Sequence, residues 1–509
     1  MLSRTTAMSK IAQFPAFLQD EFNYDLKFPQ GGSWMFRYFC GAFLLVAVLS
    51  TNSSLVAQDA QADLEALKEQ ADVAYRQRDF SKTIDLSNQV LAKSANDHVA
   101  LYLRGSARVE LGIMTGKIES LRQGISDSRE AIRHEGKGKA EYYLPYIFGM
   151  SNLADMEGKP NHAKTAKTVV DSVLEREDLT NEQRANLYYQ RAQADMRLKD
   201  AAAAEADLDQ AIQLQPTHLA AHMSKAELAA TTKTASEANA VFSKVVQAFP
   251  DNPVVYNNRG MFLQSQGKAA EAVADFNQAI KLDGRFIPAY INRGFAYMEA
   301  GDSASAEEAL SQALKVDPSQ AGAQSLRATA RLNQNKVAEA LSDYKKVVEL
   351  APENPMAHAD YGFAQFFSGD FAGSFQSLNQ ALAQDSSMRF LTPWKLASAI
   401  RAGSYKQADY QDSIAKPEGS RDWVDSLVLF QLGQVDAGTL LKSIHPDDQE
   451  AQKAQLCEGY YFIGMELLRR DRQKDAIGYW KQATKSKLPK LSAYRGAVFA
   501  LKNSGVEVR

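Results

Sequence analysis

The sequence predicts an all-α solenoid built from about twelve stacked helix–turn–helix pairs. Two stretches carry this prediction, residues 253–284 and residues 287–318, because they match at an offset of 34 residues. The matching pairs are Tyr256 with Tyr290, Asn258 with Asn292, Arg259 with Arg293, Gly260 with Gly294, Gly267 with Gly301, Ala272 with Ala306 and Ala279 with Ala313. A fixed period of this length is typical of architectures in which each unit buries its apolar face against its neighbours.

Each repeat unit has the pattern of two helices joined by a short turn. In residues 253–284, two stretches with helical apolar periodicity flank a glycine turn. Gly260 and Ala272 are small enough to let the two helix backbones approach closely. Tyr256 and Phe276 supply the large apolar area that fills the remaining space.

A regular array is predicted over residues 185–418. Units begin every 34 residues, at positions 185, 219, 253, 287, 321, 355 and 389. Small residues on the turn side of the second helix keep the same period: Ala204, Ala238, Ala272, Ala306, Ala340, Ser374 and Ala408. Proline cannot continue a helix, and it closes four of the units, at Pro216, Pro250, Pro318 and Pro352.

The repeats are less regular on either side of this array. Residues 58–184 predict divergent pairs with loop insertions, the clearest being an over-long connection between Gly105 and Ala131. Residues 419–509 predict further pairs, with Gly464, Ala476 and Trp480 marking the last one. Residues 491–502 are expected to form a capping helix, because terminal repeats need a more polar outer face.

The N-terminal residues predict an export signal. After Met35 and Arg37, an apolar run of about 14 residues leads to small and polar residues ending at Ala57. The run is short for a membrane span of about 20 residues, so residues 35–57 favour a cleaved signal peptide over a membrane anchor at residues 36–56. Residues 1–34 would be a mis-assigned or unstructured extension, with Met35 rather than Met1 as the true start.

Composition narrows the classes of function. The 58 basic and 61 acidic residues nearly balance, which gives no electrostatic footprint for nucleic acid. The 2 cysteines, Cys40 and Cys457, cannot form a disulfide framework or a structural zinc site. The sequence contains no nucleotide-binding glycine motif, nucleophile elbow or zinc-protease motif. We therefore expect no catalytic activity and no cofactor.

One pair of side chains has the spacing of metal ligands. His218 and His222 lie four residues apart and could share a helix face. However, His222 occupies the repeat position of Tyr256 and Tyr290, which favours a packing role, and no third ligand is in view.

The repeat pattern resembles the tetratricopeptide repeat over about residues 64–490. The end of the chain, with Trp423, Phe430 and residues 456–464, is similar to that of exported bacterial tetratricopeptide proteins. The resemblance implies a right-handed superhelix whose first helices line a concave face. It also implies that Asn258 and Asn292 grip the backbone of an extended peptide there, since an amide side chain offers both a donor and an acceptor.

Six apolar side chains are expected on the same face. They are Met261, Phe295, Met298, Phe363, Phe366 and Phe367. Exposed on a concave surface they would anchor a partner, whereas tucked between helices they would belong to the core. Of the six, Phe363 is the one expected to be most exposed.

Arginine recurs at one repeat position, at Arg104, Arg191, Arg259, Arg293 and Arg327. One interpretation is salt bridging between repeats with packing of the side-chain stems. The other is capture of acidic side chains from a bound peptide.

Together these features predict a non-catalytic scaffold of the bacterial periplasm or cell envelope that binds a protein or an extended peptide. Membrane contact is expected only through residues 35–57, if they stay uncleaved. The alternatives are a polysaccharide-binding protein of the envelope, which would use the phenylalanine cluster, and a regulatory subunit of a transferase. The identity of the partner, the pathway and the oligomeric state do not follow from the sequence.

Overall fold

A computed structural model describes residues 61–135, 139–444, 448–488 and 491–506. All regular secondary structure among these residues is helical, which confirms the predicted all-α repeat solenoid. The expected signal segment at residues 35–57 and the extension at residues 1–34 lie outside the described residues.

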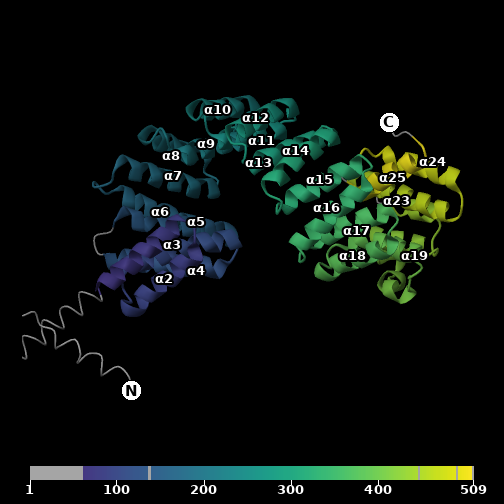
Figure 1. The fold of residues 1–509 in the computed structure, drawn as a ribbon, viewed down its shortest axis with the longest axis horizontal. Coiled ribbons are helices and arrows are strands. Elements are labelled where there is room, and N and C mark those ends of the chain that lie inside the picture. The colour runs from purple at the N-terminus through teal and green to yellow at the C-terminus, as the bar shows by residue number, and fades with distance from the viewer. Residues whose placement is uncertain (1–60, 136–138, 445–447, 489–490, 507–509) are drawn as a thin grey trace, which may run out of the picture. The chain divides into compact units, whose positions relative to one another are not determined.

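The chain divides into two compact units, Met1–Asp200 and Ala201–Arg509. In the first unit, residues 61–76 are helical. They are followed by α2 (Phe80–Lys93), α3 (His98–Thr115), α4 (Ile118–Glu135), η2 (Ala140–Tyr142), α5 (Tyr143–Glu157), α6 (Pro160–Leu174) and α7 (Asn181–Arg197). Consecutive helices of this unit pack against each other as antiparallel neighbours (Figure 1).

The second unit begins with a regular series of helix pairs. Its helices are α8 (Ala201–Leu214), α9 (Leu219–Thr232), α10 (Ala235–Ala248), α11 (Pro253–Ser265), α12 (Ala269–Leu282), α13 (Ile287–Glu299), α14 (Ser303–Val316), α15 (Ala321–Asn333), α16 (Val337–Leu350), α17 (Pro355–Ser368) and α18 (Phe371–Gln384). From α11 to α18 each odd-numbered helix pairs with the next even-numbered one, and that helix then packs on the following pair.

The second unit ends in shorter and less regular elements. These are η3 (Arg389–Leu391), α19 (Thr392–Arg401), η4 (Gln407–Tyr410), α20 (Gln411–Ala415), η5 (Glu418–Ser420), α21 (Trp423–Gln431), α22 (Ala437–Lys442), α23 (Gln449–Arg469), α24 (Gln473–Thr484) and α25 (Ser492–Asn503). The pair that begins at residue 389 therefore differs from the regular pattern. Its second helix is reduced to η4 and α20, and the chain leaves helical geometry just before Pro417.

Small residues set the distance between the helices of a pair. A Cβ atom on Gly260 would lie 2.7 Å from Cε1 of Phe276, so only glycine lets the ring of α12 cross α11 this closely. Phe276 is fully buried at that crossing. Gly464 and Trp480 repeat the arrangement between α23 and α24. The glycine of the first helix and the aromatic residue of the second helix are thus in direct contact where the two helices cross.

The turns inside the pairs also follow the 34-residue period. Gly267, Gly301 and Gly369 adopt left-handed backbone angles, with φ of 73°, 80° and 88°. Asn335 takes the same role in the pair between Gly301 and Gly369, with φ of 64°. Asparagine tolerates this region better than most residues, which explains why the register survives the loss of a glycine.

The loop insertion expected between Gly105 and Ala131 is wrong. The extra residues lengthen both helices instead, so that α3 and α4 each have 18 residues and are joined by a short turn at Gly116. Gly112 and Gly124 allow the extension, because a Cβ on either would lie 2.7 Å from backbone atoms of the facing helix. The additional residues of this unit therefore lengthen α3 and α4 by about one helical turn each.

The recurring arginines form ion pairs mainly within a helix pair and not between repeats, which corrects the first interpretation. Arg259 binds both carboxylate oxygens of Asp275 at 2.7 and 2.6 Å, and Arg327 binds Asp343 at 2.9 and 2.7 Å. Arg104 binds Asp127 in the same way. Arg191 instead reaches Asp171 of the preceding helix. The guanidinium groups of Arg104, Arg259 and Arg327 are thus already held by internal carboxylates.

Candidate functional site

Three asparagines form a hydrogen-bonded row on α11 and α13, which we call the asparagine strip (Asn257, Asn258 and Asn292). Asn292 Nδ2 donates to Asn257 Oδ1 at 2.9 Å, and Asn257 Nδ2 donates to Asn258 Oδ1 at 3.2 Å. Asn257 is the buried centre of the row, with 5% of its surface exposed. Asn258 and Asn292 are half-buried and form its two ends.

The ends of the asparagine strip keep hydrogen-bonding capacity. Among the described residues, no hydrogen bond of the chain uses Asn258 Nδ2 or Asn292 Oδ1. One end therefore offers a donor and the other an acceptor. A peptide unit of an extended chain presents the complementary pair whatever side chain it carries.

Asn257 was not predicted from the sequence. Its counterparts in the neighbouring units are Met223 and Ile291, so the repeat alignment gives it no polar pattern. The only signal in the sequence was the pair of adjacent asparagines, Asn257 and Asn258. A buried amide such as that of Asn257 can join its neighbour to the next helix by accepting one hydrogen bond and donating another. The structure shows that link directly.

Two apolar side chains flank the asparagine strip. Met261 and Phe295 occupy equivalent positions in α11 and α13, and 49% and 39% of their surfaces are exposed. Large apolar side chains exposed beside polar groups with free capacity are typical of a binding surface. Met298 lies on α13 one turn beyond Phe295 and is half-buried.

The three phenylalanines of α17 do not belong to this surface. Phe363, which was expected to be the most exposed of the set, is 5% exposed, and Phe366 and Phe367 are also buried. The rings of Phe363 and Phe366 pack edge-on against Trp394 at 5.1 and 5.3 Å. The expectation of exposed anchors on α17 is therefore wrong, because α19, α23 and α25 cover this helix.

Both histidines of the spaced pair have structural partners. His218 caps α9 by accepting from the backbone N–H of Ala221. Nε2 of His222 lies 3.0 Å from the carbonyl oxygen of Pro216, and its ring packs edge-on against Phe249. In the described part of the chain, no group of three or more metal-ligating side chains comes together.

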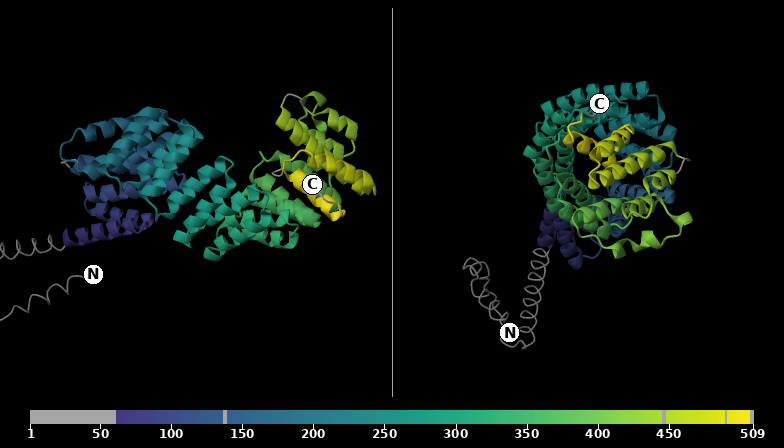
Figure 2. Two further views of the ribbon diagram at one scale, coloured as in Figure 1. Left: turned by 90° about the horizontal axis from the view of Figure 1, so that it is seen from above. Right: turned by 90° about the vertical axis from the view of Figure 1, so that its right-hand side faces the viewer.

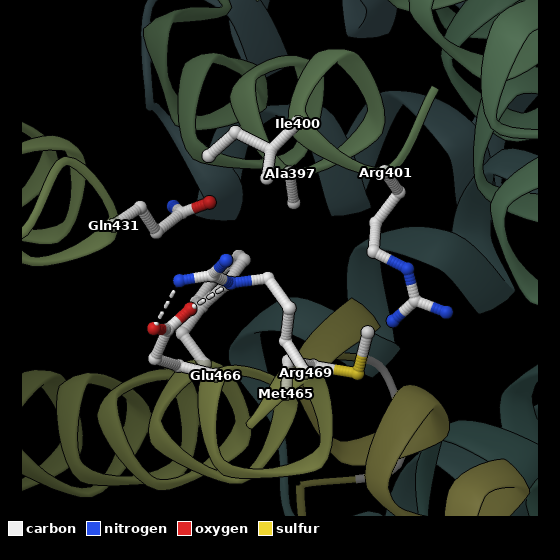
Figure 3. A pocket seen from close by; sticks show the side chains of 8 residues that line it. Ala397, Ile400, Arg401, Gln431, Met465, Glu466 and Arg469 are labelled. Atoms are coloured by element: carbon white, nitrogen blue, oxygen red, sulfur yellow. Dashed lines mark hydrogen bonds and ion pairs between the residues drawn. The ribbon is translucent and has the colours of Figure 1, made fainter. Parts of the chain in front are cut away.

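Figure 3 shows a second candidate, a cavity between α19, α21 and α23. Glu466 and Arg469 both extend from α23 along one side of the cavity, and their oxygen–nitrogen distances are 2.7 Å. Burial raises the pKa of Glu466, but hydrogen bonds from Arg469 and Arg470 outweigh this effect and leave the pKa below its usual value. The cavity has a volume of about 30 Å³, enough for a water molecule but too small for a peptide side chain.

Family comparisons agree with the repeat geometry. A model described as tetratricopeptide repeat matches residues 189–253, 291–355 and 325–389, and a second model with the same description matches residues 254–286. The chain is a tetratricopeptide repeat protein. Among curated protein sequences, none matches this tetratricopeptide repeat protein.

Several solved structures are similar to parts of this tetratricopeptide repeat protein. PilF of Pseudomonas aeruginosa is 18% identical, and the match covers 47% of this chain and 99% of PilF with a TM-score of 0.34. The pilus biogenesis factor PilW is 21% identical over 41% of this chain and 94% of PilW, with a TM-score of 0.33. The first repeat domain of Spaghetti (RPAP3), solved with an HSP90 peptide, is 29% identical over 23% of this chain and 91% of its own, with a TM-score of 0.22.

No helix in the described residues has the length and hydrophobicity that a membrane span requires.

Proposed function

We propose that this tetratricopeptide repeat protein is a non-catalytic scaffold that binds an extended peptide segment of a protein partner along α11 and α13. The observation that carries the proposal is the asparagine strip, which leaves a free donor at Asn258 and a free acceptor at Asn292. These groups would hold the main chain of the segment, while Met261 and Phe295 would contact its apolar side chains. Recognition of the backbone gives affinity that depends little on sequence.

Part of the asparagine strip is committed to the fold. The bond between Asn292 and Asn257 links two repeat pairs, so replacing Asn292 removes a contact between repeats as well as a binding group. Asn258 accepts one hydrogen bond from its neighbour Asn257 and makes none to another helix among the described residues. Asn258→Ala is therefore the cleaner probe of binding, and Asn292→Ala needs a parallel measurement of stability.

The test is capture of partners from the native cells with the triple variant Asn258→Ala/Asn292→Ala/Phe295→Ala. We expect the variant to lose at least one protein that co-purifies reproducibly with the unaltered chain, as identified by mass spectrometry. Met356→Ala is the matched control, because this side chain on α17 is as exposed as Met261 but lies outside the surface. If the triple variant retains every partner, the asparagine strip does not bind them.

The polysaccharide alternative requires aromatic platforms open to a sugar ring. The phenylalanine cluster of α17 does not provide them, because all three rings are buried against Trp394 and its neighbours. The structure therefore favours a peptide over a glycan at this surface.

We further propose that the protein acts in the bacterial cell envelope, on the strength of the signal-like residues 35–57. Mass spectrometry of the purified protein would identify its first residue. A chain that begins near Gln58 would support export with cleavage, whereas a chain that still contains residues 36–56 would indicate a membrane anchor.

A further inference from the structure

Helix α25 packs against two different sets of helices, one on each face. One face packs on its own neighbours, with Ala493, Gly496 and Ala497 buried against α23 and α24. The approach is close, since a Cβ on Gly496 would lie 2.7 Å from the ring of Tyr461. This contact fixes the helix firmly to the end of the second unit.

The other face of α25 returns to the repeat helices. The ring of Phe499 lies 5.7 Å from that of Phe367 on α17, and Lys502 Nζ donates to the carbonyl oxygen of Asn333 at 3.3 Å. Figure 1 shows the yellow α25 beside the green helices α15 and α17, and Figure 2 gives two further views of the same helices. Helix α25 thus packs against repeat helices that lie much earlier in the chain.

The facing surfaces do not fill the space between them. A pocket of about 400 Å³ remains between α25 and the helices α13, α15 and α17. Its apolar lining comes from both sides and consists of Met298, Leu332, Phe367, Val498 and Phe499. This volume is large enough for a bulky apolar side chain together with neighbouring atoms.

Two cations of α25 border the same pocket. Arg495 lines it, and its Nε atom is buried without a hydrogen-bond partner. The hydrogen bond from its Nη2 to Ser492 Oγ is long, at 3.4 Å. Lys502 also lines the pocket. Buried guanidinium donors without a partner are costly, so this site favours an incoming anion.

One acidic side chain also lines the pocket. It is Glu299, whose Oε2 accepts a hydrogen bond from Gln264 Nε2 at 2.7 Å. Burial raises the pKa of Asp360, and the positive charge of Arg495 partly opposes this effect. Among the described residues, neither carboxylate forms an ion pair with Arg495 or Lys502. With Arg495, Lys502 and Glu299 as its charged lining residues, the pocket carries a formal charge of +1.

Helix α13 links the pocket to the asparagine strip. Met298 follows Asn292 by six residues on this helix, about 9 Å along its axis, so a segment held at Asn292 would pass Phe295 and reach Met298 in fewer than two helical turns. We propose that the pocket receives a bulky apolar side chain of the bound segment while Arg495 and Lys502 bind a carboxylate beside it. The partner is then an extended peptide with an acidic residue next to a bulky apolar one. This inference rests on the proposed function and adds α25 as the specificity-determining element.

Four fluorescein-labelled decapeptides test this specificity against the full-length chain by fluorescence anisotropy. They share a background of Ser, Asn and Gly and differ at two adjacent positions, which carry Phe or Ser and Glu or Gln. We expect the Phe–Glu peptide to bind at least about tenfold more tightly than either singly changed peptide, since each lost contact is a charge-assisted bond or a buried ring. Equal affinity for all four peptides would overturn the proposal.

Variants assign the two preferences to residues. Arg495→Gln and Lys502→Gln should each reduce the Glu-over-Gln ratio and leave the Phe-over-Ser ratio unchanged, whereas Phe499→Ala should do the reverse. Lys481→Gln on the exposed side of α24 is the control for loss of one positive charge. Thermal unfolding followed by circular dichroism identifies a variant that has lost its fold. Because Lys502 is exposed, its variant keeps the test decisive even if Arg495→Gln is destabilised.

The outcomes separate this inference from the proposed function. Asn258→Ala should weaken all four peptides by the same factor, because it acts on the main chain. If Asn258→Ala weakens binding while the α25 variants change neither ratio, the asparagine strip binds peptides and the role of α25 is wrong. If neither set of variants changes binding, both are wrong.

Discussion

Helices α13 and α17 carry phenylalanine at the same repeat position and use it in opposite ways. Phe295 on α13 lies on the surface, while Phe363, two repeats later, is packed against Trp394. The residue three positions earlier also differs, being Asn292 in one helix and, in the other, Asp360, whose pKa is raised by burial. The repeat register thus fixes where a side chain lies on its helix. Whether that side chain is buried depends on which later helices pack over it, as they do on α17.

Removing each ring in turn tests whether the two phenylalanines differ in their contribution to stability. Phe363→Ala should lower the free energy of unfolding by about 3–5 kcal/mol, as expected for a buried ring that leaves a cavity. Phe295→Ala should change it by no more than about 0.5 kcal/mol. Urea unfolding followed by tryptophan fluorescence suits the measurement, because Trp394, Trp423 and Trp480 all lie in the second unit. Equal effects of the two changes would contradict the contrast.

A smaller effect is expected where α25 meets α17. The rings of Phe367 and Phe499 lie 5.7 Å apart, and such a pair contributes about 0.5–1.5 kcal/mol beyond its buried area. A double-mutant cycle with Phe367→Ala and Phe499→Ala should therefore give a coupling energy in this range. A cycle with Phe295→Ala in place of Phe367→Ala provides the control. Strict additivity of the first pair would show that α25 does not contact α17 in solution.

The smallest effect concerns pH. Burial raises the pKa of Asp360 above its ordinary value of 3.8, so the folded protein favours the protonated carboxyl more than the unfolded chain does. Its stabilising contribution is complete below pH 3.8 and is lost as the pH rises through the folded pKa. Asp360→Asn should remove this dependence and raise the urea midpoint at neutral pH.

Most of the repeat framework could be predicted from the sequence. The period follows from residues whose role is local, such as Gly267 and Gly301 in the turns and Gly260 against Phe276 at the crossing. The arginine pairs could also have been found. Asp275 and Asp343 both stand 16 residues after an arginine of the ladder, whereas Arg293 has Ala309 at that distance and binds Asn277 and Gln312 instead.

The candidate site was predictable only in part. Asn258, Asn292, Met261 and Phe295 were proposed from the sequence because they repeat between neighbouring units. Phe363 was misplaced because the helices that bury it come later in the chain, and no periodic signal records where they return. Arg495 and Phe499 were not predicted as site residues, because α25 lies outside the repeat pattern and the alignment does not record which helices it contacts. Contacts between distant segments are therefore what the repeat alignment leaves out.

The contact between Asn333 and Lys502 joins residues that are 169 positions apart. In an open array each pair meets only its neighbours, so terminal pairs can unfold one after another. Here the return of α25 to α15 and α17 closes a long chain loop that includes α16 to α24. Unfolding that starts at the C-terminal end must therefore first break the contacts of α25 with α15 and α17. The second unit should therefore melt in a more cooperative step than its repeat count alone would suggest.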